Sequence, residues 1–298
     1  MLPASLGTAP RSTLESLFPV LREAVKTKIV AIYSENADFQ ILETLQRNRN
    51  KRNKLQQFFV EGVRPVTQAM QNAWKIQALI YSPERRLSNW AENILQNAQA
   101  QVHYALPLSL MQKLSQKDES SELMAIVSMP EDRLERISEQ EPLLLVVFDR
   151  PSSPGNLGTV IRTSDALGVQ GMVITGHAVD LYDPETIRAT TGSFFALPVV
   201  RQPSHQELLP WFDELRQRHN GLQIVGTSSK ARLPIHEFDF TQPILLLIGN
   251  ENHGLSEGYK ALADAMVTIP MSGSASSLNA ACAASILLYE ITRQRRFK

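Results

Sequence analysis

The chain has 298 residues, 43% of them hydrophobic and 20% charged, and its 30 basic residues balance 30 acidic ones. This composition excludes a disordered chain and is typical of a globular protein long enough for two compact domains. The net charge is zero, so any polyanion site has to come from local clusters of basic residues. The single cysteine, Cys282, excludes a disulfide framework and favours a reducing compartment, so we expect a cytoplasmic protein. The longest apolar runs are too short for a bilayer and no export signal opens the sequence, so no membrane contact is expected.

The N-terminal part of the chain predicts an extension followed by a small α/β domain. Residues 1–37 contain Pro3, Pro10 and Pro19 with weak periodicity, which indicates an extension. From residue 38 strand-like and helical patterns alternate. The expected strands are 57–61, 76–81, 102–105 and 123–127, and the expected helices are 65–74, 87–97 and 108–114. This alternation predicts a domain over residues 38–129.

Residues 130–142 are charged and bracketed by prolines, which predicts a linker. The second domain, 143–298, contains nearly continuous apolar runs that are typical of a parallel sheet buried on both faces. The expected strands are 143–148, 172–175, 197–200, 222–226, 244–248 and 266–270, and the expected helices are 157–167, 206–218, 258–265 and 277–293. The fold class is therefore predicted to be α/β in both domains.

Three loops after these strands carry the candidate chemistry, because ligands of open α/β sheets bind at the carboxyl ends of strands. The first loop, residues 149–158, leads into a helix with Arg162 one turn further on. We expect Asn156 to cap this helix, Gly158 to allow a close backbone approach, and Arg162 to point toward the loop. A capped helix with a surface arginine explains the same residues.

The second loop places Asn250 and Glu251 between Gly249 and Gly254. Its glycine spacing resembles a phosphate-binding loop, but Leu255 stands where the lysine is needed, which argues against a nucleotide hydrolase. The loop also contains a histidine, but no second histidine or cysteine has ligand spacing, so no metal is expected.

The third loop, residues 269–279, precedes a helix rich in alanine, and we expect Ser277 to cap that helix. No Gly-x-Gly-x-x-Gly follows a predicted strand, so a dinucleotide site and a Rossmann-type S-adenosylmethionine site have no support.

Together the loops resemble the signature of the SpoU (TrmH-like) branch of the SPOUT RNA methyltransferases. The matching residues are N-L-G-x-x-x-R from Asn156 to Arg162, I-G-N-E-x-x-G-L-S from Ile248 to Ser256, and I-P-M-x-G-x-x-x-S-L-N from Ile269 to Asn279. This resemblance covers residues 143–289 and implies a parallel SPOUT-type sheet with a deep trefoil knot, a homodimer, and methyl transfer from S-adenosylmethionine to a ribose 2′-hydroxyl. The first domain is similar to the family's ribosomal-protein-like RNA-binding module, through residues 47–54 and 58–62.

The resemblance implies roles for particular residues. Arg162 would have the key catalytic role, either as general base or as a group that stabilises the alkoxide or clamps a phosphate. Asn156 and Glu251 would orient Arg162, while Ser277 and Asn279 would fix the third loop and contact ribose or phosphate. The expected cofactor-binding residues are Thr227, Ile248, Gly249, Asn250, Gly254, Ile269, Met271, Ser277 and Leu278.

Two basic clusters are candidate RNA contacts. The first comprises Arg47, Arg49, Lys51, Arg52, Lys54 and Arg64, and the second covers residues 293–298. Both also fit solvated helix ends, where basic residues gather. The ribosomal-protein-like module makes ribosomal RNA the preferred substrate over transfer RNA. The alternatives are a transfer RNA 2′-O-methyltransferase and a catalytically silent RNA-binding protein on the same fold.

Overall fold

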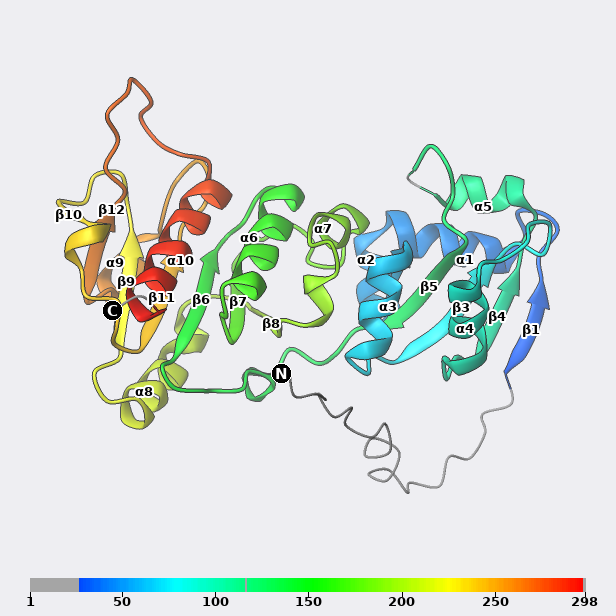
Figure 1. Cartoon of the computed structure of the whole chain (residues 1–298), viewed down its shortest axis with the longest axis horizontal. Helices are drawn as coiled ribbons and strands as arrows, with labels where there is room; N and C mark the ends of the chain where they lie inside the picture. Colours follow the sequence, from blue (N-terminus) through cyan, green and yellow to red (C-terminus); the bar gives the residue numbers. More distant parts are fainter. Residues whose placement is uncertain (1–26, 116, 297–298) are drawn as a thin grey trace, which may run out of the picture.

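The computed structural model describes residues 27–115 and 117–296, which form two α/β domains joined by one connection (Figure 1). The first domain has a five-stranded mixed sheet with the strand order β1-β4-β3-β5-β2, in which β1, β4 and β3 are parallel. Its strands are β1 (Lys28–Ala31), β2 (Gln57–Glu61), β3 (Ile76–Tyr81), β4 (Val102–Ala105) and β5 (Leu123–Ser128). Its helices are α1 (Ala37–Arg47), α2 (Arg49–Leu55), α3 (Val63–Gln71), α4 (Asn89–Asn97) and α5 (Leu108–Leu114).

The start of the first domain has to be corrected, because β1 lies within the predicted extension. Ile29 pairs with His103 of β4, and the backbone N–H of Ile32 donates to the carbonyl of Ala105. Ile32 is fully buried, so burial and strand pairing tie residues 28–37 to this domain. Residues 1–26 of the predicted extension lie outside the described residues.

The second domain has a seven-stranded sheet, and every strand pair in it is parallel, as the apolar runs predict. The order is β10-β12-β9-β11-β6-β7-β8. The strands are β6 (Leu144–Asp149), β7 (Gly171–Thr175), β8 (Val199–Gln202), β9 (Gln223–Thr227), β10 (Leu233–Pro234), β11 (Ile244–Ile248) and β12 (Ala265–Thr268). The helices are α6 (Pro154–Ala166), α7 (Pro184–Ala189), α8 (Leu209–Arg218), α9 (Glu257–Leu262) and α10 (Ala280–Arg296).

Alternate residues of the central strand β6 face two separate cores. Val146 belongs to the core with α6 and α10, while Val147 belongs to the core with α8. The sheet is therefore covered on both faces, which explains why its strands are almost wholly apolar. In the described part of the chain, no helix combines the length and the apolar character needed to cross a membrane.

Among the elements that differ from the sequence prediction are α9 and α7. Helix α9 ends at Leu262 rather than at residue 265, because Ala265 already pairs with Val225 of β9 as the first residue of β12. Helix α7 was not predicted. It has only six residues, too few for a periodic pattern, and begins where the Asp183 side chain accepts a hydrogen bond from the backbone N–H of Glu185.

The predicted close approach at Gly158 is confirmed. A Cβ atom at this position would lie 2.5 Å from the Cβ of Ala189 and 2.6 Å from the carbonyl oxygen of Thr186. Helix α6 therefore packs directly on the backbone of α7, and this contact links the first loop to the side of the domain that faces the N-terminal domain (Figure 1).

The connection between the domains, residues 130–142, is held against the second domain. It contains a short 3₁₀ turn at Leu134–Arg136, followed by Ile137, which is buried in the core with α8. Asp132 bonds to Arg201 at 2.8 Å, so polar contacts reinforce the packing.

Candidate active site

The three predicted loops meet at the carboxyl edge of the second sheet. The side-chain N–H of Asn156, in the first turn of α6, donates to Oε1 of Glu251 at 3.1 Å. The side-chain N–H of Asn279, just before α10, donates to the amide oxygen of Asn156 at 3.0 Å. One chain of hydrogen bonds therefore joins the segments that follow β6, β11 and β12.

Glu251 is the centre of this network. Its carboxylate also accepts from the backbone N–H of Ser152 at 3.0 Å, from the Ser152 hydroxyl at 2.7 Å, and from the backbone N–H of Ser153 at 3.3 Å. Burial alone raises the pKa of Glu251, but the bonds from Ser152 and Asn156 outweigh it and hold the pKa below its usual value. The ionised carboxylate thus fixes the first loop against the second.

The second loop closes tightly on itself. The backbone N–H of Asn250 donates to the carbonyl of Gly254 at 3.1 Å, and the N–H of Gly254 donates back at 2.9 Å. A Cβ atom at Gly249 would lie only 2.3 Å from the carbonyl carbon of Gly254 and from the backbone nitrogen of Leu255. Only glycine fits at this position, because the backbone of Gly254 and Leu255 packs directly against it. Both glycines of the loop line the cavity, so the loop offers backbone groups to a ligand.

An ion pair between the buried Asp149 and the half-buried Arg150, which was not predicted from the sequence, supports both loops. Asp149, at the end of β6, bonds to the Arg150 guanidinium at 2.9 Å and accepts from the backbone N–H of Ser256 at 2.8 Å. The Asn250 side chain in turn donates to the Arg150 carbonyl at 2.7 Å. The sequence signal for this ion pair was an acidic residue followed by a basic one directly after a wholly apolar run.

The two predicted helix caps are wrong. Ser153 caps α6, since its hydroxyl accepts from the backbone N–H of Asn156, and Asn156 itself lies in the first turn. Helix α10 begins at Ala280, where the Asn279 side chain accepts from the backbone N–H groups of the second and third helical residues. Asn279, rather than Ser277, is therefore the N-cap of α10. Because Asn156 is not a cap, its side chain bonds to Glu251 and Asn279 and so connects the loops.

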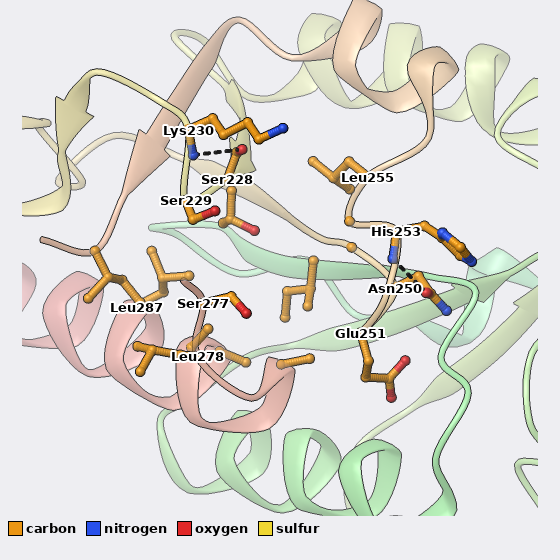
Figure 2. Close-up of a pocket in the computed structure, with 18 of the residues that line it drawn as sticks. Ser228, Ser229, Lys230, Asn250, Glu251, His253, Leu255, Ser277, Leu278 and Leu287 are labelled. Atoms are coloured by element: carbon orange, nitrogen blue, oxygen red, sulfur yellow. Dashed lines mark hydrogen bonds between the residues drawn. The ribbon is translucent and has the colours of Figure 1, made fainter. Parts of the chain in front are cut away.

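A cavity of about 340 Å³ lies between the second and third loops and α10 (Figure 2). All nine residues predicted to bind the cofactor line it: Thr227, Ile248, Gly249, Asn250, Gly254, Ile269, Met271, Ser277 and Leu278. A polar part of the wall was not predicted from the sequence: Ser228, Ser229 and Lys230 after β9, and Lys260 of α9. A Ser-Ser-Lys run at a strand end was the signal for three of them.

Arg162 is exposed on α6 and is not part of the cavity wall. Within the described residues, no hydrogen bond or ion pair involves its guanidinium. The expected direct orientation by Asn156 and Glu251 is therefore not observed, because both side chains bond to each other and to the loops. The guanidinium is free to meet a substrate.

Five residues of the first basic cluster are exposed, and the sixth is buried between the two domains. Arg47, Arg49, Lys51, Lys54 and Arg64 are exposed. The prediction that Arg52 contacts RNA is wrong for this structure, because the residue is only 1% exposed and bonds to Asp180 of the second domain at 2.6 Å.

The second basic cluster is largely engaged in structural contacts. Arg293 pairs with Glu290 at 2.7 Å, and Arg295 donates to the carbonyl oxygens of Phe240, Leu143 and Gln242. Residues 297–298 of this cluster lie outside the described residues.

The sequence matches two known families, each over one domain. Residues 143–289 match the SpoU rRNA Methylase family, and residues 36–125 match the SpoU L30e-like domain. A 23S rRNA (uridine(2479)-2′-O)-methyltransferase from Streptomyces viridochromogenes is 47% identical over 265 residues, which are 89% of this chain and 92% of the relative. The chain belongs to the SpoU rRNA methylase family.

Solved structures of SpoU enzymes share both domains. The SpoU methyltransferase AviRb from Streptomyces viridochromogenes, in complex with the cofactor AdoMet, has a TM-score of 0.83 and 47% identity, and the match covers 87% of this chain and 98% of AviRb. An AdoMet-bound rRNA methyltransferase from Sinorhizobium meliloti has a TM-score of 0.78 and 30% identity, with 91% and 99% covered. The predicted SpoU resemblance and the α/β fold class of both domains are confirmed.

Proposed function

We propose that this SpoU protein transfers a methyl group from S-adenosylmethionine to a ribose 2′-hydroxyl of 23S rRNA. The observation that carries the proposal is the convergence of Asn156, Glu251 and Asn279, which brings three separate signature loops to one cavity. The S. viridochromogenes relative is a 23S rRNA 2′-O-methyltransferase, and its similarity spans both domains. The substrate of this relative, together with similarity over both domains, supports ribosomal RNA over transfer RNA as the substrate.

The cavity fits S-adenosylmethionine in size and chemistry. Its volume of about 340 Å³ lies in the usual range for small-ligand pockets, and Ile248, Ile269 and Leu278 give apolar walls suited to an adenine ring. The backbone of the second loop offers hydrogen bonds to the adenosine. Lys230 lies at the rim and supplies a positive charge for the carboxylate of the amino-acid tail (Figure 2). When bound there, the cofactor supplies the activated methyl group.

Arg162 is proposed to act on the RNA. Guanidinium stays protonated over the accessible pH range, so we favour stabilisation of the ribose oxygen as it loses its proton, or a clamp on the neighbouring phosphate, over a role as general base. Glu251, Asn156 and Asn279 align the loops that hold the two reactants, and such alignment lowers the barrier. Ser277 is proposed to contact the ribose, and its position on the cavity wall supports this role.

The exposed side of the first basic cluster is proposed to bind RNA phosphates. Arg47, Lys51, Lys54 and Arg64 are open to solvent on the N-terminal domain, and Arg49 is exposed although its Nη1 donates to the carbonyl of Ala178. Phosphate contacts of this kind weaken steeply as the salt concentration rises. Neutralising Lys51 and Lys54 together is expected to flatten the salt dependence of RNA affinity, and an unchanged slope would remove them from the interface.

The protein is proposed to form a homodimer through one exposed face of α10. Cys282, Ile286 and Tyr289 are spaced four and three residues apart and are exposed on the same helical face. Ile286 is 39% and Tyr289 59% exposed, and an apolar stripe beside the site suits a second copy of the chain. Sedimentation of the Ile286→Glu variant tests this, with a monomer expected and an unchanged dimer contradicting it.

The family resemblance also supports a deep trefoil knot in the second domain. The turn after β11 and the segment before α10 line one cavity, as expected if the chain threads between them. The single cysteine supports the proposed cytoplasmic location.

The proposed activity is tested with purified protein, methyl-labelled S-adenosylmethionine, and 23S rRNA and transfer RNA from cells that lack the protein. Digestion to nucleosides is expected to place the label on one 2′-O-methylnucleoside from 23S rRNA. Label on a base, or label only in transfer RNA, would contradict the proposal. Cofactor binding without transfer to any RNA would instead indicate a catalytically silent RNA-binding protein.

A further inference from the structure

The two domains are joined by an aromatic cluster that crosses their boundary. Phe58 and Trp74 come from the N-terminal domain, and Tyr182, Phe194 and Phe195 come from the catalytic domain. Ring centroids are 4.9 Å apart for Phe58 and Tyr182 and 5.2 Å apart for Trp74 and Phe195. Four of these rings are buried in one continuous core, and the half-buried Trp74 packs against it. Interfaces between domains of one chain are ordinarily more polar and allow motion, whereas a hydrophobic interface of this kind holds the domains together.

A buried ion pair lies beside this cluster. Nε and Nη2 of Arg52 donate to Oδ2 of Asp180 at 3.0 and 2.6 Å, and both side chains are almost fully buried. Nη1 of Arg52 donates to the carbonyls of Leu45 and Gln46 at 3.0 and 2.7 Å. Asp180 also accepts from the backbone N–H of Tyr182 at 3.1 Å. Desolvation makes buried pairs poor sources of stability, so their best-supported role is to specify one geometry.

Directional hydrogen bonds around the pair fix the same orientation. Nη1 of Arg201 donates to the Asn53 side chain at 3.1 Å, and the indole N–H of Trp74 donates to the carbonyl of Phe195 at 2.9 Å. Nη1 of Arg49 donates to the carbonyl of Ala178 at 2.9 Å. Each bond crosses the domain boundary, and two of the three involve a residue of α2. Aromatic packing alone allows sliding, but bonds of fixed direction do not.

Helix α2 carries both the joint and the proposed RNA contacts. Lys51 and Lys54 on this helix are exposed, while Arg52 between them is buried against the catalytic domain. Figure 1 shows α2 and α7 facing each other where the domains meet. A cation that contacts RNA is therefore attached to the same short helix that is bonded to the catalytic domain.

We propose that Arg52 is a positioning residue whose ion pair with Asp180 holds both domains as one rigid body. The distance from the exposed cations of α2 to Arg162 is then constant, and the enzyme selects RNA in which the anchoring element and the target nucleoside are separated by that distance. This inference rests on the proposed function, because it assigns the N-terminal domain a role in selecting the methylated nucleoside.

The rigid joint is tested by electron-spin distance measurements that do not depend on activity. Labels are attached at Asn97→Cys on α4 and Gln217→Cys on α8, both exposed positions, in a Cys282→Ala background. Labelled chains are mixed with excess unlabelled protein, so that only distances within one chain contribute. The parent protein is expected to show one narrow distribution, and the Arg52→Met/Asp180→Leu double variant a broader or shifted one.

The double variant removes both charges together, so neither Arg52 nor Asp180 leaves an unpaired buried charge. Circular dichroism and a cooperative thermal transition identify folded protein before the distances are compared. Lys51→Met on the same helix is the matched control, with an unchanged distance and weaker RNA binding expected. A folded double variant with the parent distance distribution would overturn the proposal.

Transfer to 23S rRNA provides the second readout. Misplacing a target by about an ångström costs about 10²-fold in rate, so a large loss in kcat is expected for the double variant. The KM for RNA and the dissociation constant for S-adenosylhomocysteine are expected to stay near the parent values, because the exposed cations and the cavity are intact. A parent protein that methylates no RNA would refute the proposed function, whereas the distance measurement would still decide the rigid joint.

Discussion

Asn279 donates its side-chain N–H to the amide oxygen of Asn156 at 3.0 Å, although 123 residues separate the two in the sequence. Asn156 in turn donates to Glu251, and Asn279 also caps α10 with its own side-chain oxygen. Each of these side chains therefore bridges two elements, and a change at one of them displaces the others. The site is held by this network, while Arg162, six residues after Asn156 on α6, has no partner among the described residues.

Replacing Arg162 with alanine is expected to lower the methyl transfer rate by at least about 10²-fold, the usual loss when a group that stabilises a developing oxyanion is removed. Cofactor affinity should stay unchanged, because Arg162 is not in the cavity wall. Single-turnover transfer and calorimetric titration with S-adenosylmethionine measure the two effects. Arg133→Ala, at an exposed site in the connection, is the control with unchanged activity. Turnover within twofold of the parent for the Arg162 variant would refute the assignment.

Two glycines of the site give a matched pair. Gly249→Ala places a Cβ atom 2.3 Å from the backbone of Gly254 and Leu255, so the loop has to open and cofactor affinity is expected to fall more than about tenfold. Gly273→Ala in the third loop meets no atom within 4 Å and should bind the cofactor normally. Calorimetry compares the two variants, and equal affinities would show that closure of the second loop is irrelevant to binding.

Lys230→Met tests the proposed contact with the amino-acid tail. Affinity for S-adenosylhomocysteine is expected to drop roughly tenfold, as for loss of a charge-assisted hydrogen bond. Affinity for methylthioadenosine, which lacks that tail, should not change. If both ligands bind normally and RNA affinity falls with a smaller salt dependence, Lys230 contacts a phosphate instead.

The pKa of Glu251 predicts a response to acid. Burial raises this pKa, but the hydrogen bonds from Ser152 and Asn156 lower it more, so the folded value lies below the unfolded value of about 4.3. The resulting stability is complete above about pH 4.3 and is lost as the pH falls through the folded pKa. We expect Glu251→Gln to lower Tm at neutral pH and to differ least from the parent in strong acid. A Tm difference that is the same at every pH would contradict this.

His219 predicts a response in the opposite direction. Burial lowers its pKa, but hydrogen bonds with Glu139 at 2.7 Å and Glu141 at 2.6 Å dominate and raise the pKa above its usual value. The stabilisation is present below about pH 6.5 and is lost as the pH rises through the folded pKa. Tm should therefore fall at alkaline pH in the parent and much less in His219→Gln. An NMR titration that gives His219 a pKa below about 6.5 would disprove the account.

Local patterns predicted much of the sheet and many residues that line the cavity. The strand Ile244–Ile248 matches the predicted bounds, because a wholly apolar run between polar loops is a local signal. The meeting of the three loops follows from parallel strands, whose carboxyl ends share one edge. The nine predicted residues of the cavity wall were therefore accessible to sequence reasoning, whereas the polar run after β9 and Lys260 of α9 were not predicted.

Long-range partners were not predictable in this way. Arg52 appears in the sequence as one more cation in a basic run, and its partner Asp180 is 128 residues away. The strand at Lys28–Ala31 is an edge strand of only four residues, and α7 has six, so neither produces a clear period. The caps were misassigned because Ser153, Asn156, Ser277 and Asn279 are all good capping residues, and only the backbone decides which is used.

Methyl transfer to a ribose of 23S rRNA is expected to depend on Arg162. The most direct test of this expectation is a map of 2′-O-methyl groups in 23S rRNA from cells without the gene, complemented by either the parent or the Arg162→Ala protein. We predict that one methylated position disappears with the gene, returns with the parent protein and stays absent with the variant. A map that is identical in all strains, or a position restored equally by the variant, would contradict the account.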